Sequence, residues 1–248
     1  MQIEGKRVLV TGASRGLGRT LAFAFAEAGA REILAGTRNV ADRERLLTEA
    51  TKRNANITPV QLDVRSDNDV NAAVQLGAVD ILVNNAGVAG YGNPITMESA
   101  TFQEEIDVNY LGTLRMVRAF APAMIAQGSG VIVNVATAFA KVNLPIVGTY
   151  CATKAALLSL GQALRAYLSD KGVVVITVLP TTIDTDMSRG ADVPKMGVEF
   201  VAQEILQAIR EEKHDPTIGD EARSIVEGLA KDPLGLEKMI GQYKARDI

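Results

Sequence analysis

Near its amino terminus the chain reads Arg7-Val8-Leu9-Val10-Thr11-Gly12-Ala13-Ser14-Arg15-Gly16-Leu17-Gly18, an apolar run followed by a glycine-rich turn. The run Arg7–Val10 predicts a buried β-strand, and the Ala/Phe-rich stretch Leu17–Ala28 predicts a helix. Glycines allow the backbone to turn tightly and to approach a bound group, and a helix start offers unpaired N–H groups. The order strand, glycine turn, helix therefore predicts a phosphate-binding site, although a plain strand-to-helix turn would share this glycine content.

The alternation of short apolar strands and longer helices continues along the chain. Further strands are expected at Glu32–Ala35, Ile57–Leu62, Asp80–Val83, Val131–Val135 and Val173–Leu179. Helices are expected at Ala41–Lys52, Asn68–Leu76, Met97–Ala126, Gly148–Gly172 and Val198–Glu212. Because no linker or repeat divides this pattern, we predict a single α/β domain over residues 1–248. Its architecture should be a doubly wound, Rossmann-like parallel sheet with helices on both faces.

The pattern loosens after Pro180. Residues 181–198 predict a polar loop that covers the site and contacts the substrate. Beyond the following helix we expect a short strand at Thr217–Gly219 and two amphipathic segments, Ala222–Leu229 and Leu236–Tyr243. These two segments are interpreted as structural capping.

Composition narrows the classes of function. The 248 residues are 47% apolar and 22% charged with a net charge of −3, and no basic run provides a footprint for nucleic acid. No apolar stretch reaches the length of about 18 residues that a membrane helix needs, and no signal peptide is recognisable. We therefore expect a cytoplasmic protein with neither nucleic-acid nor membrane partners. The lone Cys151 and the lone His214 predict no internal disulfide and no histidine-rich metal site.

Tyr150 and Lys154 stand four residues apart in a predicted helix, so both side chains lie on one face. An ammonium beside a phenol favours the phenolate and lowers its pKa, which would make Tyr150 a usable acid and base. The same spacing is common on ordinary helix surfaces, so the pair needs support from the rest of the chain.

The end of the second predicted strand bears on nucleotide choice. NAD-binding sites carry an acid there, whereas this chain has Gly36-Thr37-Arg38. Arg38 and Arg15 could together clamp a 2′-phosphate, which predicts a preference for NADP(H) over NAD(H). In the alternative, both arginines are solvated and Arg38 pairs with Asp42 or Glu44.

Three motifs occur in order at predicted strand ends: Thr11–Gly18, Asn84-Asn85-Ala86-Gly87 and Tyr150-x-x-x-Lys154. In this combination the whole chain resembles the short-chain dehydrogenase/reductase family. The resemblance implies an oxidoreductase that interconverts a carbonyl and an alcohol by hydride transfer, with Tyr150 as general acid/base. It also implies that Lys154 lowers the pKa of Tyr150 and binds the nicotinamide ribose, and that Asn109 supports a proton relay through water.

The glycine turn and the resemblance together predict a set of cofactor-binding residues along the strand ends. These residues are Gly12, Ser14, Arg15, Gly16, Leu17, Gly18, Arg38, Asp63, Val64, Asn85, Ala86, Gly87, Lys154, Pro180, Ile183 and Thr185. Among them, Asp63 and Val64 are expected near adenine, and Ile183 and Thr185 near the nicotinamide carboxamide.

Two positions depart from the family pattern. The family's catalytic serine lies thirteen residues before the tyrosine, where this chain has Thr137, and a glycine is expected where it has Thr181. A threonine hydroxyl still donates and accepts, but its methyl group restricts χ1 and narrows the site. These departures motivate an alternative function, a catalytically impaired, nucleotide-binding regulatory protein, whereas the retained Tyr150 and Lys154 favour an enzyme.

The predicted substrate is a small or medium, largely apolar molecule. The residues expected to complete its pocket are Tyr91, Ala138, Phe139, Asn143, Leu144 and the loop Met187–Met196. The Tyr150 helix has a leucine stripe (Leu157, Leu160, Leu164, Leu168) and a small-residue face (Ala152, Ala156, Ser159, Ala163, Ala166). One face can pack on the sheet and the other on a second copy, and the resemblance adds that a homodimer or homotetramer is expected.

Overall fold

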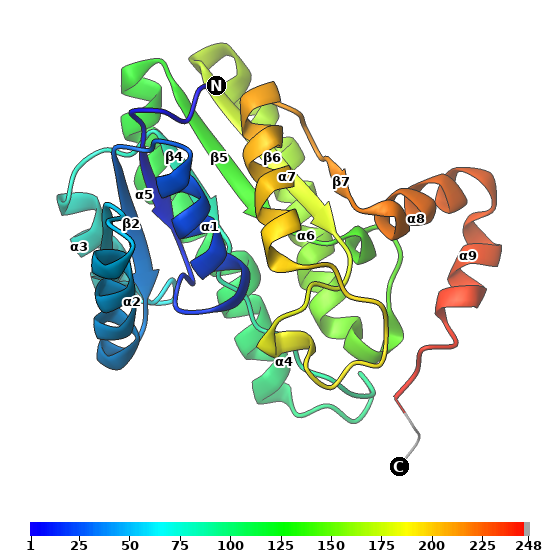
Figure 1. The fold of residues 1–248 in the computed structure, drawn as a ribbon. Helices are drawn as coiled ribbons and strands as arrows, with labels where there is room; N and C mark the ends of the chain where they lie inside the picture. The colour runs from blue at the N-terminus through cyan, green and yellow to red at the C-terminus, as the bar shows by residue number, and fades with distance from the viewer. Residues whose placement is uncertain (246–248) are drawn as a thin grey trace.

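Parallel strands form the centre of the protein in a computed structural model that describes residues 1–245 (Figure 1). The strands are β1 Arg7–Val10, β2 Glu32–Thr37, β3 Ile57–Gln61, β4 Ile81–Asn84, β5 Gly130–Val135, β6 Val173–Pro180 and β7 Thr217–Ile218. They form one seven-stranded sheet in the order β3-β2-β1-β4-β5-β6-β7. The strand order reverses between β1 and β4, which opens a crevice at the carboxyl ends of the strands. The predicted doubly wound, single-domain α/β fold is therefore confirmed.

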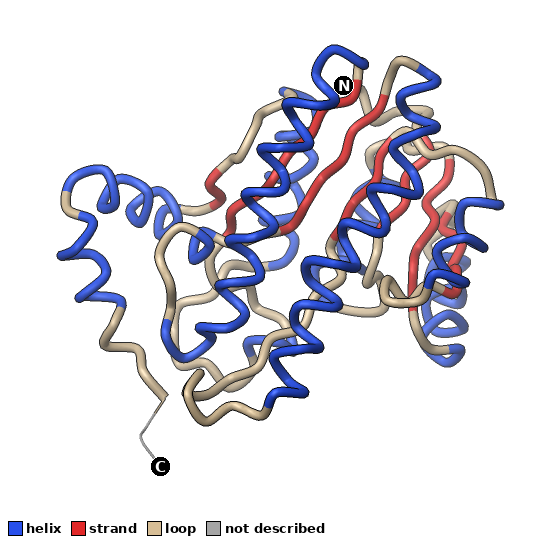
Figure 2. Tube along the Cα trace, turned by 180° about the vertical axis from the view of Figure 1, so that it is seen from behind, coloured by secondary structure: helices blue, strands red, loops and turns tan. Residues whose placement is uncertain are grey.

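Helices cover both faces of this sheet. The α-helices within residues 1–245 are α1 Gly16–Glu27, α2 Val40–Lys52, α3 Asp67–Gln75, α4 Ser99–Ile106, α5 Thr113–Gln127, α6 Gly148–Leu168, α7 Val198–Glu211, α8 Asp220–Lys231 and α9 Pro233–Ile240. Side chains of α1, α2 and α7 enter one buried cluster, and those of α3, α5 and α6 enter the cluster on the opposite face of the sheet. Figure 2 shows the helices and the sheet from behind. No helix within residues 1–245 combines the length and the apolarity needed to cross a membrane.

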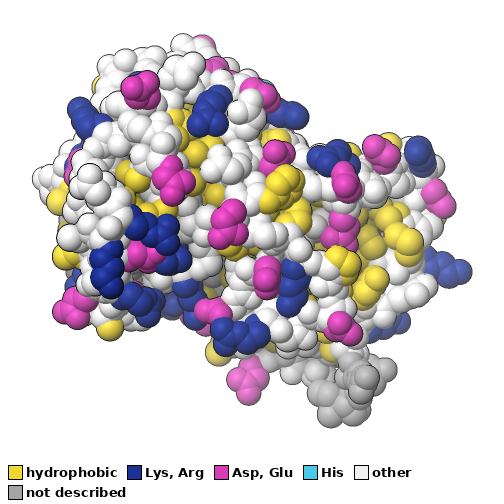
Figure 3. Space-filling view, viewed as in Figure 1, with side chains coloured by type: hydrophobic (Ala, Val, Ile, Leu, Met, Phe, Trp, Pro, Cys, Tyr) yellow, Lys and Arg dark blue, Asp and Glu magenta, His cyan; other side chains and the backbone are white. Residues whose placement is uncertain are grey.

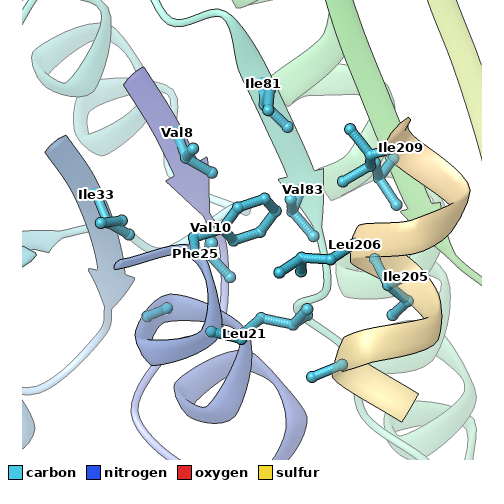
Figure 4. Packing of buried hydrophobic residues seen from close by; sticks show 14 of the residues in the cluster. Val8, Val10, Leu21, Phe25, Ile33, Ile81, Val83, Ile205, Leu206 and Ile209 are labelled. Carbon is cyan, nitrogen blue, oxygen red and sulfur yellow. The ribbon is translucent and has the colours of Figure 1, made fainter. Parts of the chain in front are cut away.

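Alternation along the strands explains this two-sided core. Val8 and Val10 of β1 lie in one cluster, whereas Leu9 between them lies in the other. Figure 4 shows the first cluster, where Phe25 of α1 and Leu206 of α7 pack against the strands. Full burial of one such large apolar side chain contributes about 1.5–3 kcal/mol. The core therefore holds the carboxyl ends of the strands in fixed positions beneath the crevice.

The helical stretch predicted at Met97–Ala126 is interrupted in the structure. A π-helical turn, Asp107–Gly112, joins α4 to α5. Gly112 packs directly on Val64, because a Cβ at this glycine would lie 2.6 Å from the Val64 side chain. The turn contains Asn109 and places its amide in the interior of the protein.

The carboxyl-terminal segments also differ from the prediction. Helices α8 and α9 extend beyond β7 at one side of the sheet, as Figure 1 shows. Ile225 of α8 and Leu236 and Ile240 of α9 pack against Ala138 and Val142, which follow β5. The interpretation of these segments as structural capping is incomplete, because they also form a wall of the cavity described next.

Candidate active site

A single cavity of about 1500 Å³ runs along the carboxyl ends of the strands, from the start of α1 to α9. All of the residues predicted to bind the cofactor line it, from Gly12 to Thr185. Thr137, Tyr150 and Lys154 line it as well, whereas Asn109 does not. The fold therefore brings the sequence motifs to one continuous space.

The glycine turn forms a backbone cradle at one end of this cavity. Gly12 has a φ of +66°, and a Cβ at this position would lie 2.9 Å from the Cα of Ala86. The Thr11 hydroxyl accepts hydrogen bonds from the N–H groups of Asn85 and Ala86, each at 3.0 Å, and so joins the first two motifs. The N-cap residue of α1, Arg15, makes no side-chain cap, and the first turn of the helix contains no acid. This arrangement fits a pyrophosphate, which would take the place of a side-chain cap.

Arg38 lies exposed at the end of β2 and lines the cavity. It forms no ion pair or side-chain hydrogen bond with any other residue of 1–245, so the alternative pairing with Asp42 or Glu44 is not observed. Asp42 instead binds Arg45, with the Arg45 Nη2 atom 2.7 Å from its Oδ1 atom. Arg38 is therefore available to an anion.

Arg45 is a cavity residue that the sequence reasoning missed. Its guanidinium lies 3.4 Å from the Ser14 carbonyl oxygen, beside the glycine turn. The available signal was its position in the second turn of α2, seven residues after Arg38. Arg15, predicted to bind a 2′-phosphate together with Arg38, has a side chain that is 71% exposed. Its guanidinium lies 3.3 Å from Asp186 in the loop of residues 181–198, called the substrate loop after its predicted role. Such exposed pairs contribute little, so Arg15 can exchange this partner for another anion.

The third cofactor segment lies at the end of β3. Arg65 donates to both carboxylate oxygens of Asp63 and holds the pKa of this carboxyl below its ordinary value. The Asp63 backbone N–H donates to Asp69 at 2.9 Å. Asp63 therefore presents a fixed, charged acceptor at the expected adenine end.

Tyr150 and Lys154 lie on one face of α6, as expected from their spacing, with the ammonium 5.6 Å from the ring centroid. Lys154 is buried, donates to the Val135 carbonyl oxygen at 2.8 Å, and has its pKa lowered to about 8 by burial. Burial also raises the pKa of Tyr150, with smaller contributions from Cys151, Tyr91 and Glu105. The expected lowering by Lys154 does not accompany this shift, whose largest cause is desolvation of the phenol.

Asn109 is fully buried behind the cavity wall. Its amide donates to the Val88 carbonyl at 2.9 Å and to the Thr153 hydroxyl at 3.0 Å, and its Oδ1 atom accepts from the Val88 N–H at 2.9 Å. Its backbone carbonyl accepts from the Thr113 hydroxyl at 3.1 Å. Because it binds both Val88 and Thr153, this side chain ties the wall to α6.

Thr137 is buried at the end of β5 and points its hydroxyl at neighbouring backbone. The hydroxyl donates to the Pro180 carbonyl at 3.0 Å and accepts from the Phe139 N–H at 3.3 Å. A hydroxyl has one proton, so donation to a substrate oxygen requires release of Pro180. Thr181 is buried beside Pro180 and lines the cavity, so the second departure adds bulk at the same point.

The other end of the cavity is mostly apolar. Tyr91, Phe139, Leu144 and much of the loop 187–194 line it, as predicted, but Ala138 and Asn143 do not. Ala138 is buried beneath α8, and the Asn143 amide donates to the Gly148 carbonyl at 3.0 Å. Periodicity could not distinguish these neighbours, because their orientation depends on a short 3₁₀ turn after Thr137.

The substrate loop is tied to the protein at several points. Its two arms pair through the Met196 N–H and the Thr182 carbonyl at 2.9 Å. The Tyr91 hydroxyl donates to the Met187 carbonyl at 2.9 Å across the cavity. Tyr91 therefore links the wall that follows β4 to the loop that follows β6.

Helices α8 and α9, with the residues after them, supply a wall that sequence reasoning missed. Its residues include Ile225, Leu236, Met239, Ile240 and Tyr243. The Ile146 N–H donates to the Tyr243 carbonyl at 3.0 Å, which closes the segment against the start of α6. Hydrophobic side chains gather on the right of Figure 3, where Figure 1 places α8 and α9. The available signal was the sequence of α9, which has more apolar residues than a helix that only covers the end of the sheet would require.

Comparisons with known proteins found a matching family model and several similar proteins. The model of the short chain dehydrogenase family matches residues 6–194. D-erythrulose reductase of Gallus gallus is 37% identical over 191 residues, which cover 76% of each chain. Helices α8 and α9 lie outside the matched family region.

Solved structures extend the likeness. A short chain dehydrogenase from Burkholderia cenocepacia in complex with NADP has a TM-score of 0.89 and 37% identity, covering 97% of this chain and 99% of its own. A 3-oxoacyl-[acyl-carrier protein] reductase from Brucella melitensis with bound NAD has a TM-score of 0.79 and 27% identity, covering 87% of this chain and 89% of its own. Both nicotinamide cofactors thus occur among similar structures.

Proposed function

Because this chain belongs to the short-chain dehydrogenase/reductase family, whose members are oxidoreductases acting on CH–OH and C=O groups, we propose that it is an NADP(H)-dependent enzyme for a largely apolar substrate. The observation that carries the proposal is the placement of Tyr150 and Lys154 in a glycine-lined cavity with Thr137. A nucleotide cradle, a proton donor and a positioning hydroxyl are the parts that reversible carbonyl reduction requires.

The residues divide the chemistry among them. When bound, the nicotinamide supplies or accepts the hydride. The Tyr150 hydroxyl donates a proton to the carbonyl oxygen in reduction and takes it back in oxidation. Because burial raises the pKa of Tyr150, this hydroxyl stays protonated in the free protein, which is the form that donates a proton during reduction. Lys154 would bind the nicotinamide ribose, and Thr137 would orient the substrate oxygen after its proton leaves the Pro180 carbonyl.

The preference for NADP(H) rests on the end of β2. Arg38, which is exposed and pairs with no other residue of 1–245, stands where an acid would select NAD(H), and Arg45 lies beside Ser14 on the same side of the cavity. A guanidinium can bind a 2′-phosphate through two parallel hydrogen bonds. Arg38 is therefore the proposed selector, with Arg45 in support.

The assembly proposal rests on α6. Its leucine stripe faces the protein, whereas Ala152, Ala156, Ser159, Ala163 and Ala166 are exposed. A row of small side chains permits close approach of a second helix. We propose a homodimer or homotetramer that uses this face, and a monomer in light scattering would contradict it.

The test is oxidation of NADPH against a panel of ketones and aldehydes, with Tyr150→Phe as the matched variant. The parent should turn over at least one apolar carbonyl compound, and Tyr150→Phe should lower kcat by about 10²–10⁴-fold while NADPH binding is retained. One observation favours the regulatory alternative, namely the engagement of the Thr137 hydroxyl by Pro180. NADPH binding without turnover of any panel member would support that alternative.

A further inference from the structure

Glu105 of α4 is a buried carboxyl group that has no part in the chemistry above. Its side chain is only 1% exposed, and its Oε1 atom accepts a hydrogen bond from the Gly90 N–H at 2.6 Å. Its Oε2 atom is buried without a hydrogen-bond partner among residues 1–245. Burial of a carboxyl group is costly, so its retention indicates a specific task.

Neighbouring acids of the same segment face other groups. Glu104 lies 3.4 Å from Arg65, and Asp107 accepts from the Gln103 amide at 3.0 Å. Glu105 alone among these three turns inward, toward the wall segment Val88–Tyr91 that follows β4. The inward direction is therefore a property of this position and not of the whole helix.

The side chains of Glu105 and Asn109 connect the helical segment to this wall by hydrogen bonds. Asn109 binds both the N–H and the carbonyl of Val88, and Glu105 binds the N–H of Gly90. Four residues of helix rise about 6 Å, and two residues of extended chain span about 6.6 Å. The spacings of the two side chains and of the two backbone groups therefore match.

Tyr91 follows directly after Gly90, whose N–H binds Glu105. Its hydroxyl donates to the Met187 carbonyl in the substrate loop, and both residues line the cavity. Gly90 packs closely on the helix, because a Cβ at this position would lie 3.3 Å from the Glu105 Oε1 atom. A shift of Gly90 would thus move Tyr91 away from the loop.

We propose that Glu105 is a positioning residue that, together with Asn109, fixes the wall segment Val88–Tyr91 and so sets the contact between Tyr91 and the substrate loop. Its kinetic consequence rests on the proposed oxidoreductase function. The fixed wall favours the closed form of the substrate end, and its loss should weaken substrate binding more than cofactor binding.

The charge of Glu105 provides a second readout. The groups that act on Tyr150 are Cys151 on α6, Tyr91 on the wall and Glu105 on α4, with Lys154 one turn along α6. The Glu105 carboxylate contributes to the raised pKa of Tyr150 and also to that of Cys151. Removal of this charge should therefore lower the pKa of Tyr150.

Four variants separate these effects. Glu105→Gln keeps an oxygen for Gly90 but loses the charge, so we expect substrate KM within about threefold of the parent and a lower apparent pKa in the pH profile of alcohol oxidation. Glu105→Leu removes the acceptor and should raise substrate KM about tenfold with little change in NADPH KM. Tyr91→Phe should raise substrate KM in the same direction, because it removes the hydrogen bond to the Met187 carbonyl. Glu104→Gln is the control and should change neither quantity.

Backbone hydrogen exchange tests the positioning role of Glu105 without any need for turnover. In Glu105→Leu the amides of residues 88–91 and 184–188 should exchange at least about tenfold faster than in the parent, and Glu104→Gln should leave them unchanged. Unchanged exchange in Glu105→Leu, or equal acceleration in Glu104→Gln, would overturn the proposal. If exchange is faster in Glu105→Leu but the parent protein reduces no carbonyl compound, the positioning role of Glu105 is supported and the proposed function is contradicted.

Discussion

The two ends of the cavity are built in different ways. At the nucleotide end, backbone atoms and glycines from consecutive strand ends form the surface, and Gly12 leaves no room for a Cβ beside Ala86. At the substrate end, the surface consists of side chains from segments far apart in the sequence, such as Tyr91, Phe139 and Met239. The first end lies within the matched family region, and part of the second lies beyond it.

This difference teaches which kind of recognition a sequence records. A pyrophosphate is bound by N–H groups that every residue has, so its site is marked by the few positions that must lack a side chain. An apolar substrate is bound by the shapes of side chains, and many combinations fill the same space. The nucleotide end should therefore respond to single charge changes, and the substrate end to changes in volume.

The largest effect is expected at Lys154, where the two ends meet. Lys154→Met should lower kcat/KM by about 10²–10⁴-fold, because the cation beside Tyr150 and the proposed ribose contact are both lost. The exposed Lys141→Met is the control and should retain activity. Full activity of Lys154→Met would show that the two ends do not meet at this residue.

The difference in free energy of unfolding between the parent protein and Lys154→Met should depend on pH. Burial lowers the pKa of Lys154 from 10.5 to about 8, so below pH 8 the ammonium is charged in the folded and the unfolded chain alike. Between pH 8 and 10.5 the folded protein loses this proton first, and its free energy of unfolding should rise relative to Lys154→Met by up to about 3 kcal/mol. Denaturant unfolding at pH 7, 8, 9 and 10 measures this difference, and a falling difference would contradict the buried ammonium.

The next effect concerns the nucleotide end alone. Arg38→Ala should lower kcat/KM for NADPH by about 10–100-fold and leave the value for NADH within about twofold, because only the 2′-phosphate contact is lost. Arg43→Ala, on the helix α2 that follows Arg38 but outside the cavity, is the control. Equal values for NADPH and NADH in the parent would break the proposed role of Arg38.

A smaller effect is expected at the substrate end. Met239→Ala should lower kcat/KM by about 3–10-fold for long-chain ketones and not for short ones, because a half-exposed apolar contact on α9 is lost. Leu234 is 78% exposed and outside the cavity, so Leu234→Ala on the same helix is the control. The same loss for every chain length would show that α9 supports stability and does not select the substrate.

The smallest effect is expected for Thr137→Ser, which keeps the hydroxyl and removes one methyl group. We expect kcat within about threefold of the parent and activity on a wider range of ketones, because χ1 becomes freer. Thr137→Val keeps the volume without the hydroxyl and should lose far more activity. Comparable activity of Thr137→Val would remove the hydroxyl from the mechanism.

Much of the fold was predictable because buried parallel strands are short, apolar runs separated by helices. The placement of Tyr150, Lys154 and the glycine turn in one cavity followed from the rule that strand ends share an edge. The raised pKa of Tyr150 was not predictable, because spacing reports the neighbouring cation but not the burial that opposes it. Met239 and Glu105 were also missed, since their roles depend on contacts between segments distant in the sequence.

The π-helical turn Asp107–Gly112 acts as a phase shift between α4 and α5. One additional residue in a helix rotates everything beyond it by about 100°, so the turn allows α5 to present its apolar side to the sheet while α4 follows a different phase. Removal of a single residue here would restore a regular helix and bring the two halves out of register. Asn109, which lies within the turn, would then lose its position against Val88, although its side chain had not been altered.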